Sequence, residues 1–594
     1  MSIRTIIVLS FCFLAACVPH NTGAAVSGTP AAAFVAESGK NVPVDSYLLY
    51  LQARQNNDAK SAVKFLKQAI KGDPDNKNLR SEMFALLTVE GRVDDAFPYA
   101  VDELKSSPDS LLASLVVIAY HVSKGDFDAA QRQIDAFPAK ADNAFLYPML
   151  EVWTQAGLGN RRKALKALSE LNKKGLEALY YFHAALLYDL WGDDDKVEEN
   201  YGALLREPGG LSLRAAQVYG NWLLRRGETG KFRALLNAYR KGAKTYPLID
   251  ETFFTAGAAV ADKKVPKSVG SAKAGVAEAF FDISGSLADK GSPEISLFFI
   301  RFGLALDPSL SLARVLLGEV YEKQQRWDEA LALYAEEKEG SEMYFAGQVR
   351  TAIIDAKRGD LEKAEKLLRS LAEKRPDLAF PWQELGGVFL TAHQYPQAAA
   401  AYTEAVNRIV VPDRSDWVLY YSRGVSYERG GRWDLAEQDL LQALVLSPDQ
   451  PATLNYLGYA WIERGKNVEK AKEMLERAAI LSPRDGAVVD SLGWMYYLLR
   501  DYQKSLTILE AALTLSPASG VINDHLGDAY WRVGRKREAR YQWAKALSVD
   551  DDFTGGDRAR VNEKLDKGLD VVGDKIVVKT APKKVKSKKV KKSK

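Results

Sequence analysis

Apolar and small residues recur along this chain at a spacing typical of packed helices. In residues 484–517, RDGAVVDSLGWMYYLLRDYQKSLTILEAALTLSP, one face of a first predicted helix carries Leu492, Gly493 and Tyr496. After a turn at Arg500-Asp501, one face of a second predicted helix carries Ser505, Leu509 and Ala512, at i, i+4 and i+7. Pro517 ends this helix, because proline has no N–H to donate and disfavours helix just before itself. Small residues such as Gly493 and Ser505 are expected where the two helices cross.

The same unit repeats at a period of about 34 residues, which is typical of helical repeat arrays. Prolines follow a similar period. Small residues at equivalent places mark the successive units: Ala62, Ala96, Ala130, Ala164, Ala330, Ala364, Ala398, Ala436, Ala471, Ser505 and Ala539. The interval from Ala164 to Ala330 is longer and irregular, and Val197 stands where a small residue is expected. Residues 46–548 therefore hold about 14 helix pairs at this period.

The repeated unit resembles the tetratricopeptide repeat (TPR). One unit carries Trp382, Leu385, Gly386, Phe389, Ala398, Tyr402 and Ala405 at seven of the eight marked positions of that family. A second carries Leu457, Gly458, Ala471, Leu475, Ala478 and Pro483, and the last carries Leu526, Gly527, Tyr530, Ala539, Trp543 and Ala546. The resemblance implies an all-α TPR α-solenoid, a right-handed superhelix with a concave inner wall.

The repeats and the composition of the segments between them predict the domain organisation. We expect an N-terminal TPR-like solenoid at 45–261, a loop at 262–275 (DKKVPKSVGSAKAG) and a C-terminal TPR solenoid at 276–548. Residues 549–574 are expected to supply a capping helix with a polar outer face. The loop is expected to divide the two solenoids.

The first residues predict export and a lipid anchor. Arg4 is followed by a short apolar run and then by Leu14-Ala15-Ala16-Cys17, which resembles the lipobox of bacterial lipoproteins. The resemblance implies that residues 1–16 are removed and that Cys17 carries the lipid; the alternative is an ordinary signal peptide with an incidental cysteine. Residues 17–44 are small and polar and predict a flexible tether with a reach of roughly 30 Å. The only other cysteine is Cys12, so the mature chain is expected to form no disulfide within its fold.

The excess of positive charge is concentrated in the last segment of the chain. Residues 575–594 hold ten lysines and no acid, and without these lysines and Arg4 the formal charge of +4 becomes −7. Such a run predicts a disordered tail. Export argues against a nucleic-acid partner, which leaves anionic lipid headgroups, an acidic partner or a purely solubilising role.

No motif of a known catalytic or metal site stands out in the sequence. Zinc-peptidase and P-loop signatures are missing, and the five histidines are scattered among different units. His183 is expected to be a core or groove residue. Asp193-Asp194-Asp195 lacks the alternating ligands of a calcium loop and is better explained as a turn that caps the next helix. We therefore expect a protein that is not an enzyme and that needs no cofactor or metal.

Binding is then the expected role, and the TPR resemblance implies where it occurs. In that family the first helix of each unit lines the inner wall, through its second, fifth, ninth, twelfth and thirteenth positions. In this chain the resulting candidates for a peptide- or protein-binding groove are Tyr421, Asn455, Tyr459, Asp490, Trp494, Tyr497, Asp524, Asp528, Trp531 and Arg532. Aromatic side chains bury a large area, and Asn or Asp can bond an extended backbone. The alternative is that Trp494 and Trp531 pack on neighbouring repeats.

The whole arrangement is similar to a group of proteobacterial TPR lipoproteins. The stretches that carry this resemblance are LGYAWIERG, DSLGWMYY and HLGDAYWRVGR, followed by Ala539, Arg540 and Trp543. It implies a membrane-anchored adaptor, facing the periplasm and held at the outer membrane, that brings cell-wall hydrolases to a carboxyl-terminal processing protease. A TPR scaffold in outer-membrane, secretion or polysaccharide assembly is the alternative.

Overall fold

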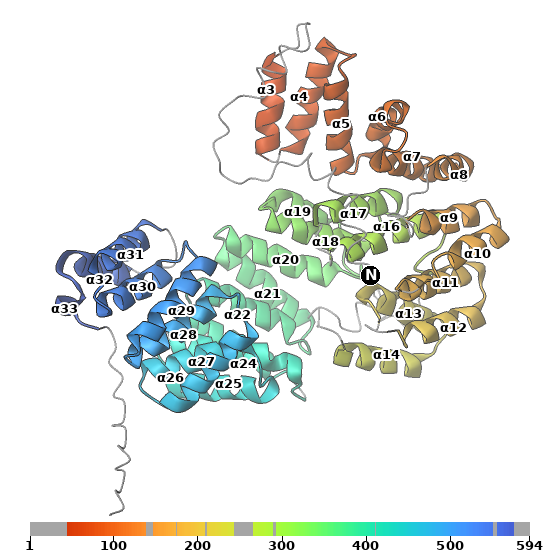
Figure 1. Ribbon diagram of the computed structural model, residues 1–594. Helices are drawn as coiled ribbons and strands as arrows, with labels where there is room; N and C mark the ends of the chain where they lie inside the picture. The colour runs from red at the N-terminus through yellow and green to blue at the C-terminus, as the bar shows by residue number, and fades with distance from the viewer. Residues whose placement is uncertain are drawn as a thin grey trace, which may run out of the picture. The chain divides into compact units, whose positions relative to one another are not determined.

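Figure 1 shows the computed structural model of the chain, in which helices follow one another along the described residues. The structure describes residues 44–56, 58–137, 146–173, 175–207, 211–242, 265–288, 293–409, 411–549 and 555–574, and within these ranges it contains helices and no strand. The predicted signal peptide, residues 17–43 of the predicted tether, and the lysine-rich tail lie outside the described residues. None of the described helices is both long and apolar enough to cross a membrane.

The chain divides into two compact units, Met1–Ala364 and Glu365–Lys594. The first unit contains α3 (Val44–Gln55), α4 (Ala59–Gly72), α5 (Lys77–Val89), α6 (Val93–Ser106), α7 (Leu111–Ser123), α8 (Phe127–Ala136), α9 (Leu146–Gly157), α10 (Arg161–Ser169), α11 (Glu177–Trp191), α12 (Asp194–Leu204), α13 (Leu213–Arg225), α14 (Thr229–Gly242), α16 (Ala272–Ala288), α17 (Pro293–Leu306), α18 (Ser311–Lys323), α19 (Trp327–Ala335) and α20 (Tyr344–Lys357).

Helix α21 (Leu361–Lys374) contains the division between the units. The second unit continues with α22 (Phe380–Thr391), α23 (Tyr395–Val406), a 3-10 turn (Arg414–Asp416), α24 (Trp417–Arg429), α25 (Trp433–Leu446), α26 (Pro451–Glu463), α27 (Val468–Leu481), α28 (Gly486–Leu498), α29 (Tyr502–Leu515), α30 (Gly520–Arg532), α31 (Lys536–Ser548), α32 (Gly555–Lys567) and α33 (Leu569–Val572). From α3 to α31 the described helices form fourteen successive pairs, as the 34-residue period predicts.

Small residues bring the two helices of a pair together, as predicted. A Cβ atom added to Gly493 would lie 2.7 Å from the side chain of Leu509, so only glycine permits this approach. Ser505 on the second helix is fully buried. The alanines that mark the repeat in the sequence, Ala62, Ala96, Ala130, Ala164, Ala330, Ala364, Ala398, Ala436, Ala471 and Ala539, are fully buried as well, and so is Val197 at the irregular position.

Many pairs use the same turn. At the end of α7, Gly125 takes a positive φ of 76°, which costs glycine little, and Asp126 then caps α8 by accepting a hydrogen bond of 2.9 Å from the Ala129 N–H. Asp193 caps α12 in the same way through the Lys196 N–H, which confirms that the Asp193-Asp194-Asp195 run serves as a turn and cap.

Two segments differ in detail between the prediction and the structure. The predicted loop at 262–275 lies within the first unit, and its last four described residues are helical, because the Ser271 hydroxyl accepts the Ala274 N–H and caps α16 at Ala272. The predicted capping helix at 549–574 is two helices, α32 and α33, joined at Gly568, whose φ is 82°. We call residues 555–574 the C-terminal strap.

Candidate protein-binding surface

The predicted groove residues come from the first helices of four successive pairs in the second unit. Tyr421 lies on α24, and Asn455 and Tyr459 lie on α26. Helix α28 carries Asp490, Trp494 and Tyr497, and α30 carries Asp524, Asp528, Trp531 and Arg532. The TPR resemblance assigns these side chains to one surface, which we call the inner wall.

The part of the inner wall on α28 is packed against α30. Trp494 is stacked between Tyr497, with ring centroids 4.6 Å apart, and His525, with centroids 3.9 Å apart. The His525 ring nitrogen Nδ1 lies 3.0 Å from both carboxylate oxygens of Asp490. Burial alone would lower the pKa of His525, but the carboxylate of Asp490 raises it overall. Because Asp490, Trp494 and Tyr497 are at most 5% exposed, they serve packing between repeats in this structure.

The carboxylates on α30 are covered by the C-terminal strap. Lys564 of α32 is 2% exposed, and its Nζ lies 2.8 and 3.0 Å from the oxygens of Asp524 and 2.8 Å from both oxygens of Asp528. Asp528 also accepts a hydrogen bond of 3.0 Å from the indole N–H of Trp543. Burial raises the pKa of Asp528 to about 6, although the neighbouring ammonium of Lys564 lowers it.

The strap also covers Trp531 and Arg532. A Cβ added to Gly568 would lie 2.5 Å from the Trp531 ring, so the backbone of the strap lies directly against the indole. Arg532 forms an ion pair of 2.8 Å with Asp574, and its partner on the wall, Tyr497, donates a hydrogen bond from its hydroxyl to the same carboxylate. The sequence did not single out Lys564, because nothing in a polar terminal helix distinguishes it from the neighbouring Lys567.

The rest of the predicted groove is more open. Tyr421, Asn455 and Tyr459 are each partly exposed. Burial raises the pKa of Tyr421 and, together with Glu463, that of Tyr459, so both phenols keep their protons near neutral pH. The Asn455 Oδ1 atom is buried, yet no hydrogen-bond donor among the described residues reaches it. A buried acceptor without a donor is costly, and a ligand N–H would satisfy it.

In the first unit, one helix of the chain itself lies along the first helices of the pairs. Helix α16 packs against α7 and α9, and its pair mate α17 packs against α5 and α7 (Figure 1). Three of its residues, Gly275, Glu278 and Asp282, share one face at i, i+3 and i+7. A Cβ on Gly275 would lie 1.9 Å from Trp153 of α9, so glycine is required there.

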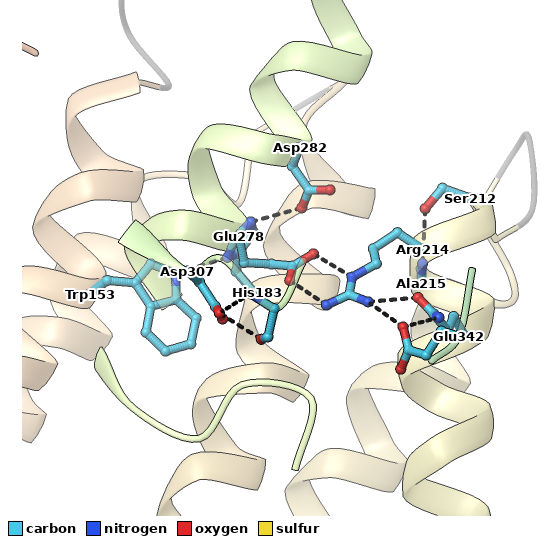
Figure 2. A network of polar contacts seen from close by, with 11 residues as sticks. Trp153, His183, Ser212, Arg214, Ala215, Glu278, Asp282, Asp307 and Glu342 are labelled. Atoms are coloured by element: carbon cyan, nitrogen blue, oxygen red, sulfur yellow. Dashed lines mark hydrogen bonds and ion pairs between the residues drawn. The ribbon is translucent and has the colours of Figure 1, made fainter. Parts of the chain in front are cut away.

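Buried polar contacts fix this helix in place (Figure 2). His183 of α11 accepts a hydrogen bond of 3.0 Å from the Trp153 indole at Nδ1, and its Nε2 lies 3.0 Å from Asp282. Burial raises the pKa of Asp282, while His183 opposes this shift. Both ring nitrogens of His183 are thus engaged, and the residue belongs to the core, one of the two roles expected for it.

Arg214 of α13 holds the other acid of α16. Its guanidinium donates two hydrogen bonds of 2.8 and 2.9 Å to Glu278, which is fully buried, and one of 2.6 Å to Gln217. Gln217 in turn donates to Glu342, 2.6 Å away. Every side chain of this set serves an ion pair or hydrogen bond, and in the described part of the chain no three His, Cys, Asp or Glu side chains are arranged to hold a metal ion.

Comparisons with known proteins agree with the repeat pattern. Models of the tetratricopeptide repeat match residues 313–341, 384–451 and 421–485. Among solved structures, the chain is similar to one in the APC/C hetero-tetramer Cut9–Hcn1, at 15% identity over 91% of this chain and 98% of that chain, with a TM-score of 0.38. Yeast Tom70 is 14% identical over 89% and 97%, with a TM-score of 0.32. A tetratricopeptide repeat protein of Parabacteroides merdae is 15% identical over 49% and 98%, with a TM-score of 0.33.

The class of protein follows from the helix pairs and the matched repeats. The fold is an all-helical solenoid of tetratricopeptide repeats, and residues 313–341 and 384–485 carry repeats that the family models match. This class indicates a scaffold for protein interactions. The open part of the inner wall, on α24 and α26, lies within the matched repeats.

Proposed function

We propose that this chain is a non-catalytic scaffold that binds a protein partner on the inner wall formed by α24 and α26. The buried Oδ1 atom of Asn455 carries this proposal, because it has no donor among the described residues and lies on the same helix as Tyr459, beside α24 with Tyr421. Asn455 as a whole is partly exposed, and its side chain would turn outward to bring this oxygen to a backbone N–H of an extended partner segment. The phenol rings would pack on its side chains.

The finer proposal rests on the resemblance of the sequence to TPR lipoproteins. We propose that Cys17 is lipidated and holds the scaffold at the outer membrane, facing the periplasm. There it would deliver cell-wall hydrolases to a carboxyl-terminal processing protease. A scaffold in envelope assembly would use the same wall for a different partner.

An affinity capture tests both the proposed binding surface and the proposed identity of the partner. The full-length chain, solubilised in detergent, is the bait in an envelope extract of the source organism, beside an Asn455→Leu variant. This variant removes the amide, with its unpaired acceptor and its N–H donors, and puts an apolar side chain of similar size in its place. We therefore expect an unchanged or slightly higher Tm but a loss of the captured partner. Tyr541→Ala is the matched control, since Tyr541 lies on α31 and is 68% exposed.

The identity of the captured proteins separates the outcomes. A processing protease and wall hydrolases, lost only with Asn455→Leu, support the adaptor. Secretion or assembly components lost in the same way support the scaffold and overturn the protease adaptor. Equal capture by the parent and by Asn455→Leu overturns the proposed binding surface.

A further inference from the structure

The C-terminal strap is attached to the inner wall mainly through charges. One of its cations, Lys564, lies between the carboxylates of Asp524 and Asp528. Its acids face the bases of the wall: Asp574 lies 2.8 Å and Asp570 3.5 Å from Arg532, and Asp570 also lies 3.4 Å from Lys536. At each of these contacts a charge of the strap faces a charge of the opposite sign.

The apolar part of the attachment is small. Val561 and Leu569 are fully buried and Leu565 is partly buried, and the other apolar side chains of the two helices are partly or largely exposed. Desolvation offsets much of the Coulomb energy of buried ion pairs, so such pairs fix a geometry more than they add stability. A segment with the same charges in the same order could therefore replace the strap at little net cost.

The surface beneath the strap is also suited to a ligand. The carboxylates of Asp524 and Asp528 converge on one point, with four oxygen atoms within 3.0 Å of the ammonium that now occupies it. Trp543 orients Asp528 by donating its indole N–H, and the Trp531 ring lies against the backbone at Gly568. This arrangement selects a primary ammonium, held next to an aromatic platform.

We propose that the strap is an internal ligand, and that the wall beneath it binds a lysine-bearing segment of a protein partner when the strap is released. The strap defines the chemistry of that segment: a lysine, followed by acids six and ten residues later, as in Lys564, Asp570 and Asp574. The residues tested here lie on α30 and α32, whereas Asn455 lies on α26, so the two proposals can be tested with different variants.

A competition experiment on the full-length chain tests the proposal. The probe is a fluorescein-labelled synthetic peptide of residues 555–574, and its binding is followed by anisotropy. We expect Lys564→Met in the chain to weaken the internal strap and to let the peptide bind at least tenfold more tightly than to the parent. Adding Asp524→Asn and Asp528→Asn should remove this binding. A peptide with Lys564→Met should not bind either chain.

Hydrogen exchange distinguishes a releasable strap from a structural cap. In the Lys564→Met chain, amides of residues 555–574 should exchange at least tenfold faster, while amides of α28 and α30 stay protected. Unchanged protection of the strap, loss of protection throughout α28–α31, or equal peptide affinity for parent and variant would each overturn the proposal. None of these results bears on the capture experiment with Asn455→Leu.

Discussion

At the scale of single residues, close contacts set by glycine determine where helices can meet. Gly493 admits Leu509 within a pair, and Gly275 admits Trp153 between α16 and α9. The first contact was predicted from the period of small residues. The second was not, because Gly275 lies in a stretch whose composition reads as a loop, and its partner Trp153 is more than a hundred residues away in the sequence.

Two glycines of α16 offer a matched pair of substitutions. Gly275→Ala places a methyl group 1.9 Å from the Trp153 ring position, and overpacking of this kind costs about 1–3 kcal/mol. In Gly285→Ala the new methyl group meets no atom within 4 Å, and alanine in an exposed helix gains about 0.5–1 kcal/mol over glycine. We therefore expect opposite shifts in the Tm of the first unit, measured by calorimetry. Shifts of the same sign would contradict the packing of α16 against α9.

At the scale of helices, the second helix of a pair can begin with an aspartate whose carboxylate caps it. Not every second helix has such a cap. Asp501 caps α29 with its carboxylate on the Lys504 N–H, and its φ and ψ are −86° and 69°. Gln394 begins α23 with nearly the same backbone, φ −88° and ψ 66°, but its side chain accepts no capping hydrogen bond.

Removing one cap and adding the other should therefore change the free energy of unfolding by similar amounts in opposite directions. Asp501→Ala removes a cap and should cost about 1 kcal/mol, while Gln394→Asp supplies one and should gain a similar amount. Urea unfolding of the second unit, followed by circular dichroism, measures both changes. Gln394→Asn is the control for charge, because asparagine caps as well as aspartate without the added negative charge. If neither Gln394 variant stabilises the second unit, then Pro396, at the second position of α23, prevents the cap from forming.

Contacts within a helix pair could be predicted from the sequence, whereas contacts outside the repeat could not. Period and small residues were sufficient for the helix pairs, since each pair is stabilised by local contacts that recur every 34 residues. The partners of α16 and of the strap were not predictable, because Glu278 meets Arg214, and Lys564 meets Asp528, through contacts outside the repeat. The candidate groove was consequently predicted as one continuous surface, although its part on α28 and α30 is buried by packing and by the strap.

At the scale of the whole molecule, each unit uses some of its own chain to cover the first helices of its pairs. In the first unit this is α16, held by a buried ion pair with Arg214 and a hydrogen bond with His183. In the second unit the strap covers the wall on α30 and part of α28, and its Asp557 lies near enough to Tyr459 of α26 to raise the pKa of that phenol. The more open surface on α24 and α26 is therefore where we expect a partner, and the tether that begins at Cys17 would place it at a membrane.

The two cysteines of the chain allow a direct test of that membrane attachment. The proposed attachment through Cys17 depends on its lipid. Cys17→Ser should abolish metabolic labelling with palmitate and should move the chain from the membrane pellet to the soluble fraction. Cys12→Ser is the matched control, because Cys12 lies in the predicted signal peptide and would be removed from the mature chain.

If the Cys17→Ser chain stays in the membrane fraction, another part of the protein attaches it to the membrane. If the Cys17→Ser chain loses its label but still sediments with membranes, the lipid is not needed for attachment. The ten lysines of residues 575–594 are then the next candidate, since each lysine near an anionic surface contributes about 1 kcal/mol. That attachment would weaken as salt is raised, because screening shortens the range of charge interactions, whereas an acyl anchor would resist a salt wash. Extraction of the membranes at high salt therefore separates the two mechanisms in one step.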